Sequence, residues 1–199
     1  ILLQTLIIKN KTIMKKNLGP VNCLYPMPVT IVGSITDGRV NYMPVAHVGI
    51  MNHDLQSYIS VSMAKIHYTT AGVKQNKAFS VNLPSQDLVV QTDYCGLVSG
   101  HDIDKSDVFE TFYGELETAP MIVECPVNME CRLYQLVDFK THDLLIGEII
   151  SAHADESILT NRTIDMDKLK PMLFDMGRKE YFKLGESFAK CWGVGMNYK

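Results

Sequence analysis

Several features are scarce in this 199-residue chain. It has one tryptophan, and its five cysteines form no Cys-x-x-Cys pair. A membrane-spanning helix needs roughly 20 apolar residues, and the opening apolar run over residues 1–8 is far shorter. Charges of neither sign predominate, because the formal net charge is -3 and the isoelectric point lies near 6.1. The composition therefore gives no electrostatic reason to expect a nucleic acid or an anionic membrane as partner.

The cysteines and histidines do not have the spacing of a disulfide framework or of a zinc site. The cysteines are Cys23, Cys95, Cys125, Cys131 and Cys191. An odd number without a close pair favours reduced thiols in a cytosolic compartment, so a cytoplasmic location is expected. Five residues separate His47 from His53, and five separate Cys125 from Cys131. Neither spacing is typical of zinc ligands, and no HExxH motif occurs.

Nucleotide-binding and hydrolase motifs are also missing. Gly193-Val194-Gly195 is followed by the chain end rather than by a helix, so it is not a dinucleotide-binding loop. There is no Walker lysine motif and no GxSxG elbow. A nicotinamide cofactor, if used, would have to bind without a Rossmann domain.

The first residues are predicted to lie outside the fold. Residues 1–13 lack the basic segment and the cleavage site of a signal peptide, and Met14-Lys15-Lys16 looks like a natural start. We therefore expect a leader over residues 1–13 and one domain over residues 14–199. The alternative is that residues 1–13 form an extra ordered strand or arm.

Short β-branched or alternating segments indicate a mainly β protein. Strands are predicted over residues 29–36, 39–51, 57–63, 78–83, 121–123, 129–137 and 144–153. Asp37-Gly38 is a strong signal for a two-residue hairpin turn, and Pro44 points to an edge strand or a bulge. Many short strands with few helices favour a β-barrel with peripheral helices.

Three helices are expected around this barrel. Thr69 is a plausible N-cap for a helix ending near residues 74–76, and Ser85 for one that runs to Cys95 and stops at Gly96. A short helix is predicted within residues 165–173, interrupted by Pro171.

Four blocks occur along the chain in a fixed order. They are Pro28-Val29-Thr30-Ile31-Val32-Gly33-Ser34, Ser60-Val61-Ser62-Met63-Ala64-Lys65 with Tyr68-Thr69, Phe79-Ser80-Val81-Asn82-Leu83-Pro84-Ser85, and Ser99-Gly100-His101-Asp102-Ile103-Asp104-Lys105. Their order and spacing resemble the flavin reductase-like family, the FMN-binding split barrels, and most closely its flavoredoxin branch. The resemblance runs from about Lys15 to near the C-terminus. It implies an FMN-binding split β-barrel, and a homodimer, because members of the family place the flavin near a subunit interface.

An FMN site needs a cation and small donors for the phosphate and ribityl chain. Candidates for that end are Ser60 and Ser62, Met63 directly after them, and Lys65 two residues further on. Tyr68 and Thr69 follow, where a helix N-terminus could direct free N–H groups toward an anion. The alternative is a solvated strand edge followed by a capped helix.

Two further blocks supply candidate contacts. Asn82 interrupts an apolar strand, and its amide has both the donor and the acceptor that the pyrimidine edge of the flavin needs. The alternative is a structural residue that closes the strand before Pro84. The resemblance implies that the block containing Ser99 and Lys105 closes over the cofactor. His101 stands where relatives commonly carry a basic residue, so its charge would depend on pH. A solvated loop remains the alternative for this block.

The remaining candidates form a possible wall for the flavin ring. They are Asn41, Met43, Pro44, Val45 and Ala46. Backbone groups beside Pro44 and Ala46 could meet the rim of the ring. The alternative is that this apolar stripe, Val45 above all, is simply core. Whether the neighbouring His47 stacks on the ring is left open, because relatives often have an aromatic residue there.

The resemblance implies electron or hydride transfer through bound FMN. Two forms are possible, a flavoredoxin-like carrier served by a redox partner protein and an NAD(P)H-dependent flavin reductase. A non-catalytic FMN-binding module for storage or sensing is the second class. A pyridoxamine-phosphate oxidase-like enzyme is a remote third, and the block from Ser99 to Lys105 argues against it.

Overall fold

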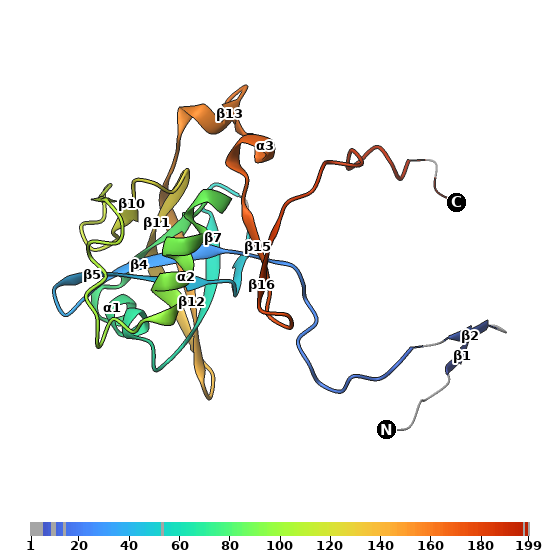
Figure 1. Cartoon of the computed structure of the whole chain (residues 1–199), viewed down its shortest axis with the longest axis horizontal. Coiled ribbons are helices and arrows are strands. Elements are labelled where there is room, and N and C mark those ends of the chain that lie inside the picture. The colour runs from blue at the N-terminus through green and yellow to red at the C-terminus, as the bar shows by residue number, and fades with distance from the viewer. Residues whose placement is uncertain (1–5, 9–10, 14, 53, 197, 199) are drawn as a thin grey trace.

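The computed structural model describes residues 6–8, 11–13, 15–52, 54–196 and 198. The protein is mostly β, as expected, and its main element is a curled seven-stranded antiparallel sheet (Figure 1). The strand order is β5-β4-β8-β11-β12-β7-β6. These strands are β4 (Thr30–Thr36), β5 (Arg39–Val45), β6 (Val48–Ile50), β7 (Tyr58–Ala64), β8 (Ala78–Leu83), β11 (Val127–Asp138) and β12 (His142–Ala154).

Smaller elements surround this sheet. The helices are α1 (Tyr68–Asn76), η1 (Gln86–Leu88), α2 (Val89–Leu97), η2 (Glu156–Ile158) and α3 (Met166–Leu169). The short strands are β3 (Met27–Pro28), β9 (Thr111–Phe112), β10 (Met121–Ile122), β13 (Leu159–Thr160), β14 (Thr163–Ile164), β15 (Met172–Asp175) and β16 (Glu180–Lys183). Strand β15 lies between β16 and β3 in a second, three-stranded sheet.

The β4–β5 hairpin forms where its turn residues predict it. Asp37 and Gly38 have φ values of +50° and +76°, and Thr36 pairs with Arg39. Two successive residues with positive φ are the mark of a type I′ turn, which matches the twist of the flanking strands. Strand β5 is an edge strand of the large sheet, which explains how it accommodates Pro44.

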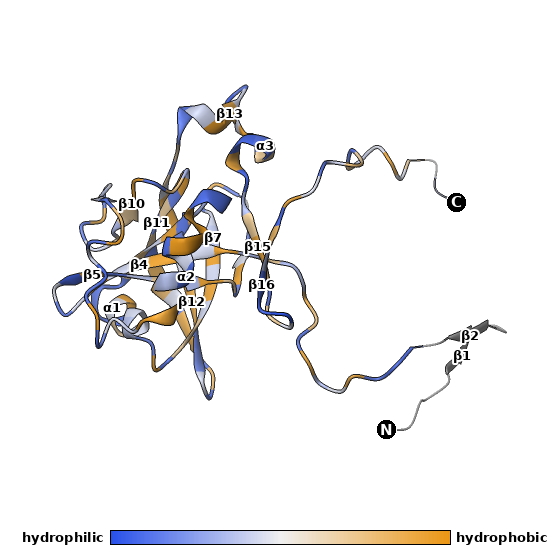
Figure 2. Cartoon of the chain, viewed as in Figure 1, coloured by the Kyte–Doolittle hydropathy of each residue, from blue (hydrophilic) through white to orange (hydrophobic). Residues whose placement is uncertain are grey.

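The alternating strands build the core inside the curl of the sheet. Val32, Val61, Phe79, Val81 and Leu145 are fully buried in one cluster. Fully burying a side chain of this kind stabilises the fold by roughly 1.5–3 kcal/mol. Figure 2 shows the same pattern, with apolar strands in the body and a hydrophilic turn between β11 and β12.

The helices begin and end slightly differently from the sequence expectation. Helix α1 starts at Tyr68 with His67 as N-cap, so the expected cap Thr69 lies inside the helix, where its hydroxyl accepts a hydrogen bond from Asn41. Ser85 caps the 3₁₀ turn η1, and α2 continues to Leu97, one residue past Gly96. The short α3 is capped by Asp165 and ends at Leu169, two residues before Pro171.

Both ends of the chain extend away from the body (Figure 1). Strands β1 (Leu6–Ile8) and β2 (Lys11–Ile13) pair with each other and with no other described strand. The expected boundary after residue 13 stays a prediction, since part of that segment lies outside the described residues. The segment after β16 leaves Phe188 and Trp192 almost completely exposed, at 99% and 96%.

Candidate functional site: a groove between β5, α1 and α2

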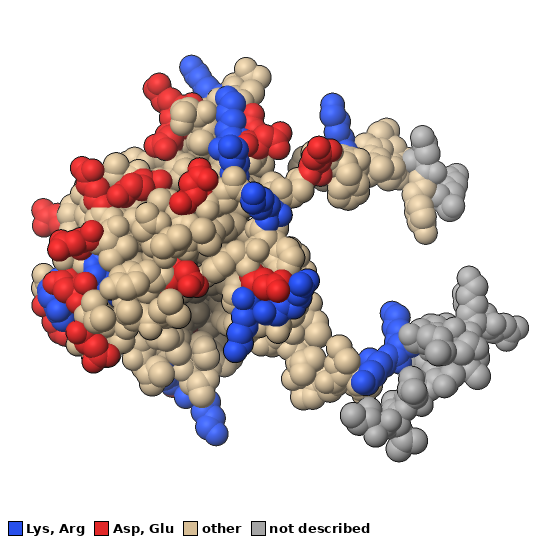
Figure 3. Space-filling model, in the orientation of Figure 1, with Lys and Arg blue, Asp and Glu red and all other residues tan. Residues whose placement is uncertain are grey.

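A groove runs along β5 and past the start of α1. It consists of two adjoining pockets that share Met43, Pro44 and His67, with volumes of about 340 Å³ and about 270 Å³. In the space-filling view the face that carries α1, α2 and β16 is hollowed near its centre (Figure 3).

The first pocket, called here the polar pocket, lies between two helix ends. Its lining is Asn41, Met43, Pro44, Ile66, His67, Tyr68, Thr69, Cys95, Gly96, Leu97, Val98, Ser99, Gly100 and Lys105. The first N–H groups of an α-helix have no partner within the helix, and they carry a partial positive charge. At α1 the N-cap residue His67 provides no side-chain cap. The pocket therefore presents backbone donors suited to an anion.

Asn41 adds an unsatisfied polar atom to this pocket. The side chain is buried, and its Nδ2 donates to Thr69 Oγ1 at 2.6 Å. Its Oδ1 is also buried and receives no hydrogen bond from any described residue. Gly100 packs directly against it, since a Cβ at that position would lie 2.3 Å from Oδ1. Buried polar atoms normally have partners, so Oδ1 marks a place where a ligand or water donor is expected.

Lys105 supplies a positive charge at the same pocket. Its side chain is only 3% exposed, and its Nζ donates to Cys95 O at 3.1 Å and Val98 O at 3.4 Å. Burial lowers the pKa of this ammonium, and the nearby Cys95 thiol acts weakly in the opposite direction. An ammonium has three N–H donors, so one remains beyond these two bonds. Lys105 therefore holds the end of α2 and keeps a donor for an anion.

Tyr68, which lines the polar pocket, is in contact with His101. The Tyr68 hydroxyl donates to Thr36 O at 3.0 Å and accepts a hydrogen bond from Arg39. The ring of His101 lies 4.7 Å from the Tyr68 ring. The exposed His101 therefore packs on Tyr68, whose ring is held in place by the two hydrogen bonds of its hydroxyl.

The second pocket, called here the apolar pocket, brings distant strands together. Its lining is Met43, Pro44, Val45, Ala46, His47, Ser62, Met63, Ala64, His67, His142, Phe174 and Met176. Val45 and Met63 also belong to the main core cluster, so these two side chains serve both the core and the pocket wall. The predominance of thioether, aliphatic and aromatic groups suits a flat apolar ring.

Eleven of the fourteen side chains proposed from the sequence line the groove. Asn41, Met43, Pro44, Tyr68, Thr69, Ser99 and Lys105 line the polar pocket, and Met43, Pro44, Val45, Ala46, Ser62 and Met63 line the apolar pocket. Their contact with a flavin stays a prediction.

Three proposed residues lie elsewhere. Asn82 is fully buried between strands, where Nδ2 donates to Ile31 O and Ser80 Oγ. Its Oδ1 accepts from Ile122 N and Asn128 Nδ2, so the amide is satisfied by the protein alone. The structural alternative for Asn82 is the one that the fold adopts.

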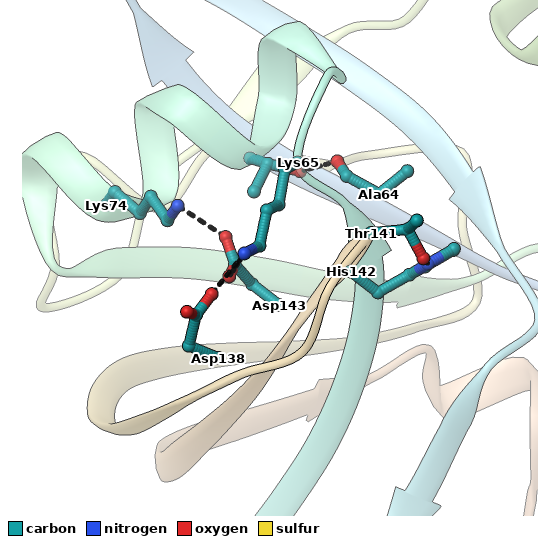
Figure 4. A network of polar contacts seen from close by, with 8 residues as sticks. Ala64, Lys65, Lys74, Asp138, Thr141, His142 and Asp143 are labelled. Atoms are coloured by element: carbon teal, nitrogen blue, oxygen red, sulfur yellow. Dashed lines mark hydrogen bonds and ion pairs between the residues drawn. The ribbon is translucent and has the colours of Figure 1, made fainter.

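Ser60 and Lys65 are the other two proposed residues that line neither pocket. The Ser60 hydroxyl donates to Gly49 O across the β6–β7 pair. Lys65 forms an ion pair with Asp138, and its Nζ lies 4.0 Å from Asp143 Oδ1 (Figure 4). Its Nζ is thereby engaged by carboxylates of the protein instead of facing the polar pocket.

Sequence reasoning missed several lining residues. Ile66 and His67 follow directly from the second block and could have been found from it. His142, Phe174 and Met176 come from β12, β15 and the turn after it. No local pattern marks them, because only the tertiary fold brings them to the apolar pocket.

Other kinds of site receive no support from the described residues. All five cysteines are free thiols. Among the residues that the structure describes, no group of three or more His, Cys, Asp or Glu side chains is arranged to hold a metal ion. No helix in the described part of the chain is long and apolar enough to cross a membrane.

Comparison with known proteins identifies the family to which this fold belongs. Residues 22–183 match the model of the flavin reductase like domain, and the chain belongs to that family. Within it, the chain is 40% identical to flavoredoxin from Methanosarcina acetivorans, with a TM-score of 0.89 over 92% of this chain and 97% of that one. Flavoredoxin of Desulfovibrio vulgaris (Miyazaki F) is 34% identical, with a TM-score of 0.83 over 92% and 100% of the two chains. An FMN-binding protein from Thermus thermophilus, 22% identical, shares the fold with a TM-score of 0.75 over 88% and 98%.

Proposed function

We propose that the protein binds FMN in this groove and transfers electrons through it. The observation that carries the proposal is the difference between the groove's two ends. One end has a helix N-terminus, a buried ammonium and an unpartnered amide oxygen, and the other is lined mainly by apolar side chains. FMN has the same asymmetry, with a charged phosphate at one end and a flat apolar ring at the other.

The residues present fit FMN at each end. Lys105, Ser99 and the first N–H groups of α1 would hold the phosphate, where charge-assisted hydrogen bonds are strongest. Asn41 Oδ1, which lacks a donor within the described residues, would accept from a ribityl hydroxyl. Met43, Met63 and Phe174 would pack against the ring. Bound FMN would supply the redox chemistry, and these residues would bind it and limit access of water to it.

The proposed physiological role is that of a flavoredoxin-like electron carrier in the cytoplasm. The identity to two flavoredoxins, 40% and 34%, supports this over a flavin reductase. The described chain carries no dinucleotide-binding loop, so a nicotinamide would find little dedicated surface. The family's preference for a flavin close to a subunit interface makes a homodimer the expected form.

Flavin uptake tests the cofactor. Purified protein, stripped of flavin if necessary, is titrated with FMN while flavin fluorescence and absorbance are followed. We expect uptake of about one FMN per subunit, with quenching on binding. An apoprotein that neither shifts nor quenches added FMN would exclude the proposed function.

Anaerobic reduction distinguishes the roles. The holoprotein is mixed with NADH, NADPH or a reduced ferredoxin while bleaching of the flavin is followed. A carrier is reduced faster by the protein donor than by either nicotinamide. Rapid bleaching by NADH or NADPH with steady turnover of free flavin would make the protein a flavin reductase. Absence of bleaching with every donor would favour an FMN-binding module for storage or sensing.

A further inference from the structure

A buried carboxylate is paired with helix α1, whose first residues line the polar pocket. Asp143, in the first residues of β12, has a side chain that is only 1% exposed. Lys74 of α1 forms an ion pair with its Oδ2, and Lys65, just after β7, lies 4.0 Å from its Oδ1 and pairs with Asp138 (Figure 4). Neither oxygen of Asp143 accepts a hydrogen bond from the described part of the chain. Two lysines are therefore its principal compensation.

A contribution to the stability of the fold does not by itself explain why a charged side chain is buried at position 143. Burying a carboxylate costs several kcal/mol, and a well-packed apolar group is often as stable in the same place. A buried ion pair does, however, fix the relative position of the elements that carry it, because displacement leaves an unpaired buried charge. At Asp143 the elements concerned are the β11–β12 hairpin and helix α1.

The same helix forms the anion-facing wall of the groove. Residues Ile66 to Thr69 line the polar pocket. The segment before them is tied to the hairpin, since Lys65 N donates to Thr141 O at 3.1 Å. Lys74, on the second turn of the helix, is tied to the same hairpin through Asp143. The hairpin thus holds α1 on both sides of its first turn.

We propose that Asp143 is a positioning residue, which through Lys74 and Lys65 holds the first turn of α1 at the polar pocket without touching the ligand. The inference rests on the proposed function and adds a determinant of its phosphate end. It also assigns Lys65 to this network instead of to the phosphate.

Electrostatics alone predicts the opposite result from positioning. Replacing Asp143 by Asn removes a negative charge beside α1 and releases Lys74, while Lys65 keeps its ion pair with Asp138. If charge were all that mattered, FMN would bind more tightly. If Asp143 positions the helix, the phosphate contacts are misaligned and FMN binds more weakly.

The measured quantity is the preference for FMN over riboflavin, which lacks the phosphate, as the ratio of their two Kd values. We expect Asp143→Asn to lower this preference about tenfold, the scale of one charge-assisted contact. Lys74→Met should lower it similarly, whereas Lys74→Arg, which keeps the ion pair, should retain it. Glu148→Gln is the matched control, because Glu148 pairs with Arg132 on the same hairpin but at an exposed site. It should leave the preference unchanged.

If Asp143→Asn alone fails to fold, the double variant Lys74→Met with Asp143→Asn replaces it in the test. The double variant removes both charges of the ion pair, so neither is left buried without a partner. Positioning predicts that its preference stays low, and pure electrostatics predicts a return to the wild-type value. An unchanged or increased preference in Asp143→Asn or in the double variant would overturn the proposal, even if the melting temperature fell. A wild-type protein that binds no FMN would instead remove the proposed function, so the two failures are distinguishable.

Discussion

The two pockets of the groove are built in different ways. The polar pocket comes mostly from two short stretches, Ile66 to Thr69 and Cys95 to Lys105, where helix ends expose backbone groups. The apolar pocket comes from side chains on β5, β7, β12 and β15, which are far apart in the chain. Directional hydrogen bonds should therefore contribute most to ligand binding in the polar pocket, and apolar contact area should contribute most in the apolar pocket.

This difference has a measurable consequence. Changes in the polar pocket should alter binding of FMN more than binding of riboflavin, because only FMN carries the phosphate. Changes in the apolar pocket should weaken both ligands equally, because both carry the ring. The four predictions below test this separation.

Filling the polar pocket should have the largest effect. A Cβ at Gly100 would lie 2.3 Å from Asn41 Oδ1 and 2.5 Å from Tyr68 Cδ1, so Gly100→Val must displace both residues. Overpacking costs about 1–3 kcal/mol. We expect FMN affinity to fall by up to about a hundredfold, measured by fluorescence titration.

Gly185→Ala is the control for this substitution. Nothing lies within 4 Å of a Cβ at that position, so FMN affinity should be unchanged. Wild-type affinity in Gly100→Val would show that the loop does not approach the ligand.

Substitutions of Lys105 and Lys65 test which of these two lysines contributes more to FMN binding. Lys105→Met removes a buried cation and leaves Cys95 O and Val98 O without their donor. We expect a loss of about tenfold or more for FMN and a smaller one for riboflavin, together with a lower melting temperature. Lys65→Met, which removes a partly exposed ion pair with Asp138, should cost FMN affinity less than Lys105→Met. A larger loss of FMN affinity in Lys65→Met than in Lys105→Met would indicate that Lys65 contacts the phosphate.

What the sequence could predict follows the same division. Turn chemistry at Asp37 and Gly38 and strand alternation gave the hairpin and the β fold, because both depend on local conformation. Ser99 and Lys105, which the sequence places in one short block, both line the polar pocket, and their contact with a flavin stays a prediction. The sequence does not show that Asn82 and Lys65 bond Asn128 and Asp138, because these partners lie 46 and 73 positions away in the chain. Residue type and spacing do not show which of two partners a polar side chain takes.

The apolar pocket should respond differently from the polar one. Phe174 is half-buried and lines it from β15. Phe174→Ala removes apolar contact, and we expect a loss of about fivefold for both FMN and riboflavin. Isothermal titration with each ligand measures it. A loss confined to FMN would place the phosphate, rather than the ring, at this end.

The smallest predicted effect is a pH dependence confined to the polar pocket. Burial lowers the pKa of Lys105 from its ordinary 10.5. As pH rises through that lowered pKa the ammonium loses its charge, so FMN affinity should fall while riboflavin affinity stays constant. The phosphate is already fully ionised above about pH 7, so we expect FMN affinity to decrease by up to about threefold as the pH is raised from there toward 10.5. The free energy of unfolding should change in the opposite direction. The unfolded chain binds more protons between the lowered pKa and 10.5, so stability rises with pH there. Lys105→Met should abolish both trends, and a pH dependence that survives this substitution would assign it to another group.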